Sequence, residues 1–176
     1  MAQKRKDWNG LISGFKASDL VFLDESGCTT DMTRRYADSL GGSRAVDSAP
    51  LSKPKNTTIL PSIQLDGTLR YTTFSGGTTV ERFKRYLETD LLPHLNGNSV
   101  LIMDNMKSHH ARAVRNLLDS SEVRCIYLPP YSPDLNPIEK MWSKLKAFLR
   151  KEKIRMASEL PSAISKGFLT IRPTDC

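Results

Sequence analysis

The chain has 176 residues and a formal net charge of +7 at pH 7, and 39% of its residues are apolar. This length lets a single domain bury its own core, and the positive charge favours an anionic partner such as nucleic acid. The longest aliphatic runs, residues 20–23 and 100–103, are far shorter than the roughly 20 apolar residues that cross a bilayer, and residues 7–15 do not form the apolar core of a signal peptide. We therefore expect a cytoplasmic, nucleoid-associated protein without membrane contact.

The first part of the chain predicts a basic leader followed by a buried strand. Residues 1–18 are basic and show no clear hydrophobic period. Residues 20–24 (LVFLD) form an apolar run typical of a buried strand, which ends at Asp24. Residues 25–56 are rich in Gly, Ser, Thr and Arg, and we assign no element to them.

A hairpin and a helix are predicted next. Residues 57–65 and 69–74 are strand-like runs that flank Asp66-Gly67, a dipeptide that favours a type I′ turn. Thr78 and Glu81 then make a capping-box pattern. It opens a helix whose apolar face contains Val80, Phe83, Leu87 and Leu91 and which Pro93 ends.

The second half alternates strands and helices. A strand at residues 100–103 precedes a helix at about 108–118, and a strand at 123–128 precedes a helix that Asn136 opens. We therefore predict an α/β fold in which a mixed sheet, an antiparallel hairpin region extended by parallel strands, is covered by helices.

The last predicted helix is the best specified. Asn136 suits its N-cap and Pro137 its first position, and four prolines at 129, 130, 133 and 137 restrict the backbone before it. Its predicted buried face is Ile138, Met141, Trp142, Leu145 and Phe148 or Leu149. On this face Trp142 is interpreted as a core residue rather than a base-stacking one.

Three carboxylates stand where predicted elements begin or end. Asp24 and Asp104 follow the two apolar strands, and Glu139 opens the last helix. Carboxylates that meet at one sheet edge could hold two Mg²⁺ ions for phosphoryl displacement. The alternatives are that Glu139 completes a capping box, that Asp104 caps a turn, and that Asp24 pairs with an arginine. Glu25 and Asp134 are interpreted as structural.

Basic residues crowd the last predicted helix and its exit. They are Lys140, Lys144, Lys146, Arg150, Lys151, Lys153 and Arg155. Such clustering on one element favours contact with nucleic-acid phosphates over general solubility. The cysteines at 28, 125 and 176 are odd in number and widely spaced, so we expect reduced thiols rather than disulfides or a zinc site.

Two segments carry a family resemblance. LIMDNMKSHHARAVRNLL followed by IYLPPYSPDLNPIEKMWSKLKAFLR, together with VFLDESGCTTDMTRRYADSLGG upstream, resembles the catalytic core of DDE transposases of the mariner-like superfamily, in its bacterial insertion-sequence branch. The resemblance runs from about residue 20 to 150. It implies an RNase H-like fold in which Asp24, Asp104 and Glu139 bind two Mg²⁺ or Mn²⁺ ions. Asn105, His109 and His110 are similar to family positions beside the metals or in contact with DNA.

The resemblance also implies an activity. Such an enzyme cleaves DNA at insertion-sequence ends and transfers the freed 3′-hydroxyl to target DNA at a TA dinucleotide, as a dimer on the DNA. Residues 19–176 would be the catalytic domain. We expect the helix-turn-helix DNA-binding domain to be absent, as when a separate reading frame encodes it, and the C-terminus to be shorter than in relatives. The alternatives are another RNase H-like nuclease and a decayed or domesticated DNA-binding remnant.

Overall fold

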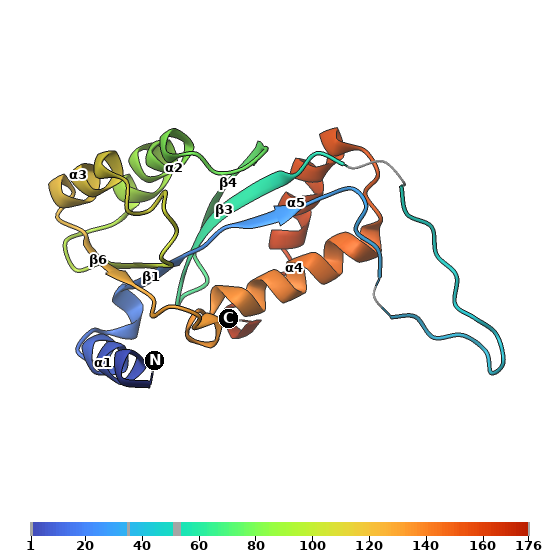
Figure 1. Cartoon of the computed structure of the whole chain (residues 1–176), viewed down its shortest axis with the longest axis horizontal. Helices are drawn as coiled ribbons and strands as arrows, with labels where there is room; N and C mark the ends of the chain where they lie inside the picture. Colours follow the sequence, from blue (N-terminus) through green and yellow to red (C-terminus); the bar gives the residue numbers. More distant parts are fainter. Residues whose placement is uncertain (1, 35, 51–53, 176) are drawn as a thin grey trace.

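The computed structural model describes residues 2–34, 36–50 and 54–175, and these contain one mixed sheet of six strands (Figure 1). The strands are β1 (Leu20–Leu23), β2 (Ser26–Cys28), β3 (Thr57–Gln64), β4 (Leu69–Ser75), β5 (Val100–Met103) and β6 (Arg124–Tyr127). Their order is β2-β3-β1-β5-β6, and β4 also pairs with β3. β1, β5 and β6 are parallel, whereas β3 is antiparallel to its neighbours β1, β2 and β4. The predicted mixed sheet is confirmed.

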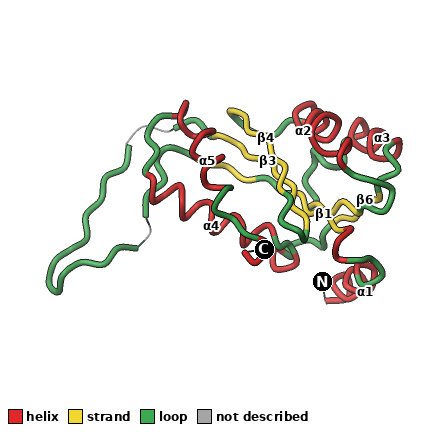
Figure 2. Tube along the Cα trace, turned by 180° about the vertical axis from the view of Figure 1, so that it is seen from behind, coloured by secondary structure: helices red, strands yellow, loops and turns green. Residues whose placement is uncertain are grey.

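Helices cover both faces of the sheet. They are α1 (Ala2–Ile12), α2 (Val80–Tyr86), α3 (Arg112–Ser120), α4 (Ile138–Glu152) and α5 (Leu160–Phe168). α2 and α3 lie over one face, and α4 and α5 lie over the other (Figures 1 and 2). None of the described helices is long and apolar enough to cross a membrane.

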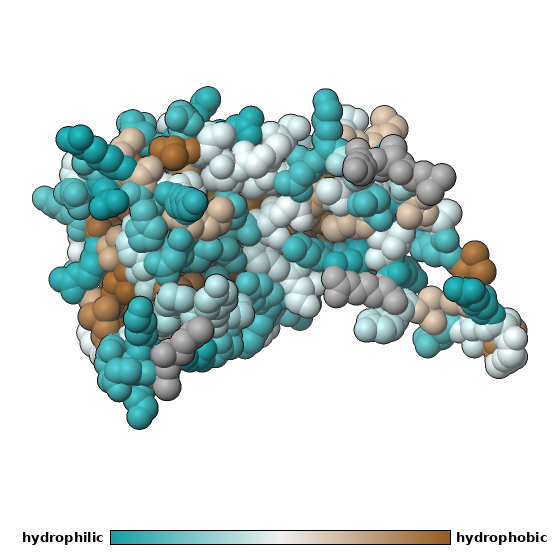
Figure 3. Space-filling model, in the orientation of Figure 1, coloured by the Kyte–Doolittle hydropathy of each residue, from teal (hydrophilic) through white to brown (hydrophobic). Residues whose placement is uncertain are grey.

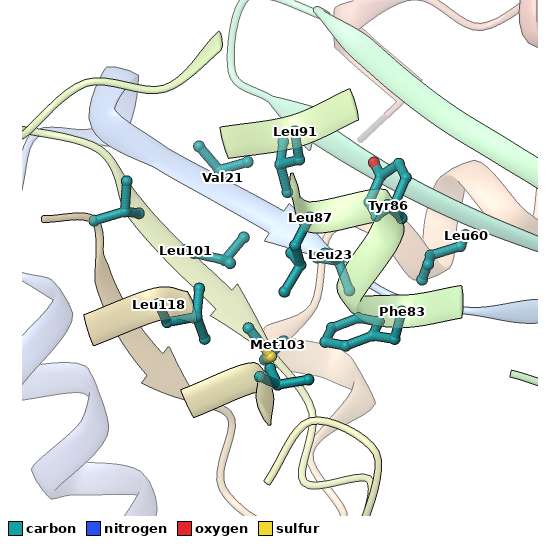
Figure 4. Packing of buried hydrophobic residues seen from close by; sticks show 12 residues of the cluster. Val21, Leu23, Leu60, Phe83, Tyr86, Leu87, Leu91, Leu101, Met103 and Leu118 are labelled. Atoms are coloured by element: carbon teal, nitrogen blue, oxygen red, sulfur yellow. The ribbon is translucent and has the colours of Figure 1, made fainter. Parts of the chain in front are cut away.

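The central strands are buried because a helical layer packs on each side of them. Val21, Leu23, Leu101 and Met103 point into a core with residues of α2 and α3, among them Phe83 (Figure 4). On the other face α4 and α5 form a second core with β3. Strands buried on both faces read as continuous apolar runs, which is why β1 and β5 were recognisable in the sequence.

Part of the basic leader, residues 1–18, is helical, although its sequence shows no clear hydrophobic period. Residues 2–12 form the helix α1, and Trp8, Ile12 and Phe15 pack on a third small core near β5 and β6. Arg5 of α1 pairs with Asp134 in the loop before α4. The helix α1 therefore packs beside β5 and β6 and is tied by this ion pair to the loop before α4.

Two local details differ from the prediction. The N-cap of α2 is Thr79 rather than Thr78, since the Thr79 hydroxyl accepts from the Arg82 N–H. The β3–β4 turn has a positive φ (84°) at Gly67 but not at Asp66, so it is not type I′, which needs positive φ at both central residues. The Gln64 carbonyl accepts from the Gly67 N–H, and the hairpin register is kept.

Residues 36–50 form no helix or strand and extend away from the sheet as an arm (Figures 1 and 2). The arm exposes apolar side chains, including Tyr36 (90% exposed) and Val46 (87%), and brown atoms mark this part of the surface in Figure 3. Arg155 donates to the Thr30, Met32 and Ser48 carbonyls. Lys153 pairs with Asp47 at 2.6 Å. These two cations therefore anchor the arm.

The cysteines form no disulfide among the described residues. Cys28 is buried and Cys125 is partly buried, and both are free thiols. Cys176 lies outside the described residues.

Candidate active site

The three predicted acids, Asp24, Asp104 and Glu139, line one cleft of about 450 Å³. Asp24 follows β1, Asp104 follows β5, and Glu139 lies in the first turn of α4. Phe22 and Ile102 are register partners in the parallel pair β1–β5, so the two aspartates, each two residues further on, emerge at the same sheet edge. The other lining residues come from the loops after β5 and β6: Asn105, Met106, Leu128, Pro129, Pro130, Tyr131, Ser132, Pro133 and Asn136.

Asp24 is held by three hydrogen bonds. Its side chain is buried, with the whole residue only 9% exposed. Oδ1 accepts from the Glu25 N–H at 2.8 Å. Oδ2 accepts from Asn136 Nδ2 at 3.2 Å and from Trp142 Nε1 at 3.1 Å. No arginine pairs with it among the described residues, so the ion-pair alternative is not observed.

Neighbouring acids act on Asp24. The pKa of Asp24 is raised to about 6, chiefly by burial. The hydrogen bonds from the Glu25 N–H and from Trp142 oppose this increase, and the negative charges of Glu139 and Asp104 contribute to it. The two other carboxylates are therefore close enough to repel the charge of Asp24. Such a group of like charges favours a bound cation.

Asp104 is held by residues of the segment between β5 and α3. Its Oδ1 accepts from the Met106 N–H at 3.0 Å and lies 2.9 Å from His109 Nδ1. Burial raises the pKa of Asp104, but the hydrogen bond and charge of His109 and the Met106 N–H outweigh it and hold this pKa below its usual value. The predicted turn-capping role is therefore combined with a place in the cleft.

His109 is fully buried and its ring stacks on Phe83 with centroids 4.3 Å apart. Of its two predicted positions, beside the metals or on DNA, this burial fits the first. Asn105 donates to the Leu128 carbonyl, and its Oδ1 lies 3.3 Å from His110 Nε2. The His110 ring packs on Tyr127, with centroids 4.2 Å apart. Asn105 and His110 thus tie the loop after β5 to β6.

The sequence interpretation of Asn136 was wrong. Its amide makes no capping bond: Nδ2 donates to Asp24, and Oδ1 is buried without a hydrogen-bond partner among the described residues. Trp142 packs in the core as predicted, yet its N–H also reaches Asp24. A buried indole N–H usually finds an acceptor, and that rule was the one available signal for this contact.

Glu139 is exposed, and its side chain makes no hydrogen bond or ion pair among the described residues. The capping-box alternative is not observed, since the Asn136 N–H donates to the Pro133 carbonyl instead. Glu139 is therefore the acid of the cleft with the greatest freedom to turn.

The basic residues of α4 have different surroundings. Lys140 and Lys151 are exposed, whereas Lys144 pairs with Asp175 at 2.6 Å. Lys146 lies 5.9 Å from the Trp142 ring centroid, and Arg150 is half-buried. Lys140 and Lys151 are therefore the two most available for phosphate contact.

The donor set of the cleft fits a hard cation. It consists of carboxylate, amide, hydroxyl and carbonyl oxygens, the ligands that Mg²⁺ prefers, and no cysteine or histidine lines it in the described part of the chain. Within the described ranges no three acidic, histidine or cysteine side chains are close enough to hold an ion. Because Mg²⁺ typically uses one or two carboxylates plus waters and substrate phosphates, a complete protein cage is not required.

Comparison with known proteins supports the fold. A structure of a pre-cleavage Mos1 transpososome matches with a TM-score of 0.79 and 19% identity, over 95% of this chain and 54% of that one. The catalytic domain of Mos1 mariner transposase matches with a TM-score of 0.72 and 18% identity, over 98% and 82%. The Mos1 mariner paired-end complex with Mn matches with a TM-score of 0.74 and 20% identity, over 98% and 54%. The predicted RNase H-like fold is confirmed.

The present chain spans about half the length of the Mos1 chains in those two complexes. No curated protein matches it. A family model described as DDE superfamily endonuclease matches residues 19–161, which include all three cleft acids. This chain belongs to the DDE superfamily of endonucleases.

Proposed function

We propose that this domain is the catalytic part of a transposase. It would cleave DNA at the ends of a mobile element and then join the freed 3′-hydroxyl to target DNA. The observation that carries the proposal is the placing of Asp24, Asp104 and Glu139, from three separate elements, around one cleft of a chain with net charge +7. One of the matched structures is a Mos1 strand transfer complex, and strand transfer is the second of the two proposed steps.

The three acids are proposed to bind two Mg²⁺ or Mn²⁺ ions. Mos1 paired-end complexes have been solved with Mn and with Mg. Bound divalent ions supply Lewis acidity to the attacking and leaving oxygens of a phosphodiester. Glu139 is exposed and free to rotate about its side-chain bonds, so it can approach the two aspartates that hydrogen bonds already hold in place.

The remaining predicted residues have supporting roles in this proposal. His109 fixes the Asp104 carboxylate, and Asn105 and His110 hold the loop beside it. Lys140, Lys146, Arg150 and Lys151, spread along α4, contact DNA phosphates, with Lys144 weakened in that role by Asp175. Phosphate contacts position the duplex without reading its sequence.

Several finer features rest on the family resemblance. We propose that the chain belongs to the bacterial insertion-sequence branch, that it acts in the nucleoid on TA-containing targets, and that it assembles as a dimer on DNA. End recognition would come from a helix-turn-helix unit, supplied separately. Residues 19–176 would then be the catalytic domain, preceded by α1.

A joining assay tests the proposal. The domain, supplemented with the helix-turn-helix protein and Mg²⁺ or Mn²⁺, is expected to join a pre-cleaved element end to a target plasmid. Asp24→Asn, Asp104→Asn and Glu139→Gln should each abolish joining, because the carboxamide keeps the shape and loses the charge. The exposed α3 variant Asp119→Asn is the matched control and should retain joining.

An end with a 3′-deoxy terminus separates the possible reactions. Joining must vanish with this end, since its nucleophile is missing, while cleavage of uncut DNA continues. Cleavage without any joined product from a folded, supplemented protein would indicate a simple nuclease. Neither cleavage nor joining with either metal would indicate a DNA-binding remnant.

A further inference from the structure

Asp24 is held by two donors from α4, the helix that carries Glu139, and from the loop just before it. Trp142 Nε1 and Asn136 Nδ2 both donate to Asp24 Oδ2, at 3.1 and 3.2 Å, across 118 and 112 residues of chain. Trp142 is 4% exposed and Asn136 5%, so water cannot easily replace either donor. Buried hydrogen bonds to a carboxylate are among the stronger ones in proteins.

These donors leave one part of the carboxylate available. Each carboxylate oxygen offers about two acceptor sites. Both sites of Oδ2 are taken by Asn136 and Trp142, whereas Oδ1 accepts, within the described part of the chain, only the Glu25 N–H. The remaining acceptor site therefore lies on Oδ1, and rotation of the carboxylate would cost two buried hydrogen bonds.

The pair also relates Asp24 to Glu139. Trp142 follows Glu139 by three residues, nearly one helical turn, and Asn136 precedes Glu139 by three. The helix α4 thus carries Glu139 and, through Trp142, a donor to Asp24, and Asn136 adds a second donor two residues before the helix begins. The amide of Asn136 is thus used for Asp24, and its Oδ1 is buried without a hydrogen-bond partner among the described residues.

We infer that Trp142 and Asn136 are positioning residues that fix the Asp24 carboxylate for divalent metal binding, an inference that rests on the proposed function. In this role both act through the Asp24 carboxylate. Removal of such an outer partner typically lowers metal affinity or activity about 10–100-fold in metal sites. The inference gives the indole N–H a role beyond packing.

Trp142→Phe tests it, because phenylalanine keeps an aromatic ring and loses only the donor and part of the volume. The chain offers a matched control in Trp8→Phe, since Trp8 Nε1 is buried without a hydrogen-bond partner among the described residues. Calorimetric titration with Mn²⁺, without DNA, is expected to show about 10–100-fold weaker binding in Trp142→Phe. Trp8→Phe should bind Mn²⁺ as the parent chain does.

A second variant and a second signal cover the case in which Trp142→Phe does not fold. Asn136→Leu has a similar side-chain shape and loses the other donor, so it should also bind Mn²⁺ more weakly. In Trp8→Phe, Trp142 is the only tryptophan left. Its fluorescence should change saturably with Mg²⁺, and Asp24→Asn should abolish this change.

The outcomes separate this inference from the function on which it rests. In one outcome Asp24→Asn loses Mn²⁺ binding, while folded Trp142→Phe and Asn136→Leu both bind Mn²⁺ within about twofold of the parent chain. This change is well below the loss expected for an outer partner, so the positioning role would be wrong and the metal site would stand. If Asp24→Asn also binds Mn²⁺ normally, both the metal site and the positioning role are overturned. Trp142 fluorescence that does not change at saturating Mg²⁺ would also refute the proposed contact between Trp142 and the metal-binding carboxylate.

Discussion

The contact between α4 and α5 allows a prediction with a defined magnitude. Gly167 of α5 is buried, and a Cβ added there would lie 2.5 Å from Leu145 Cδ1 and 3.0 Å from Phe148 Cδ1. Leu145 is fully buried, so its methyl group has no solvent to move into. Overpacking of this kind costs about 1–3 kcal/mol, while alanine in place of glycine gains about 0.5–1 kcal/mol in a helix. Gly167→Ala should therefore lose up to about 2.5 kcal/mol of unfolding free energy.

Gly10→Ala is the matched control for this experiment. Gly10 is an exposed position inside α1, and a Cβ there would meet no atom within 4 Å. It should gain about 0.5–1 kcal/mol. Urea denaturation of both variants measures the difference, and a loss of about 1 kcal/mol corresponds to about 2–4 °C in Tm for a chain of this size. A Gly167→Ala protein as stable as Gly10→Ala would show that Leu145 can turn aside, and would refute the argument.

Two further predictions concern charge and thiols. Lys140→Gln and Lys151→Gln should each reduce the slope of log DNA affinity against log salt concentration by roughly 0.9, whereas Lys144→Gln should reduce it less because Lys144 is paired with Asp175. Equal slopes for all three variants, measured by fluorescence anisotropy, would contradict the assignment of Lys140 and Lys151 as the phosphate contacts. Burial raises the pKa of Cys125 to about 11 and also raises the pKa of Cys28, so few thiolates are present at about pH 8. Disulfide-exchange reagents should modify these two thiols far more slowly in the native chain than in urea, and equal rates would show that the thiols are accessible.

The strands of the sheet could be predicted because their burial is visible in the sequence. Val100–Met103 is buried on both faces and contains no polar residue, and Thr57–Gln64 is followed by turn residues. Helix α4 was equally visible, since Ile138, Met141, Trp142, Leu145 and Leu149 are all buried at helical spacing. Phe148, the alternative to Leu149, is only partly buried.

Helix α1 could not be predicted, because its residues are mostly exposed and, among the side chains described in it, only Trp8 and Ile12 contact a core. An apolar pair four residues apart is too short a pattern to define a helix. The Asn136 cap was wrong for a different reason. Asn before a helix has two uses for its amide, a local cap or a distant acceptor, and the choice of Asp24 depends on a strand 112 residues away.

The two ends of α4 have different roles: its middle and C-terminal turns contribute to the core, and its N-terminal end contributes to the cleft. Leu145, Phe148 and Leu149, in its middle and C-terminal turns, pack with α5, whereas Glu139 lies in its first turn and Asn136 just before it. Trp142 lies between them and belongs to both, since its ring joins the core and its N–H holds Asp24. If the helix acts as a rigid rod, Gly167→Ala should lower stability with Mn²⁺ affinity unchanged, and Trp142→Phe should lower affinity by far more than its loss of packing explains. Parallel losses of stability and affinity in both variants would mean that the cleft is formed by general packing and not by the two donors.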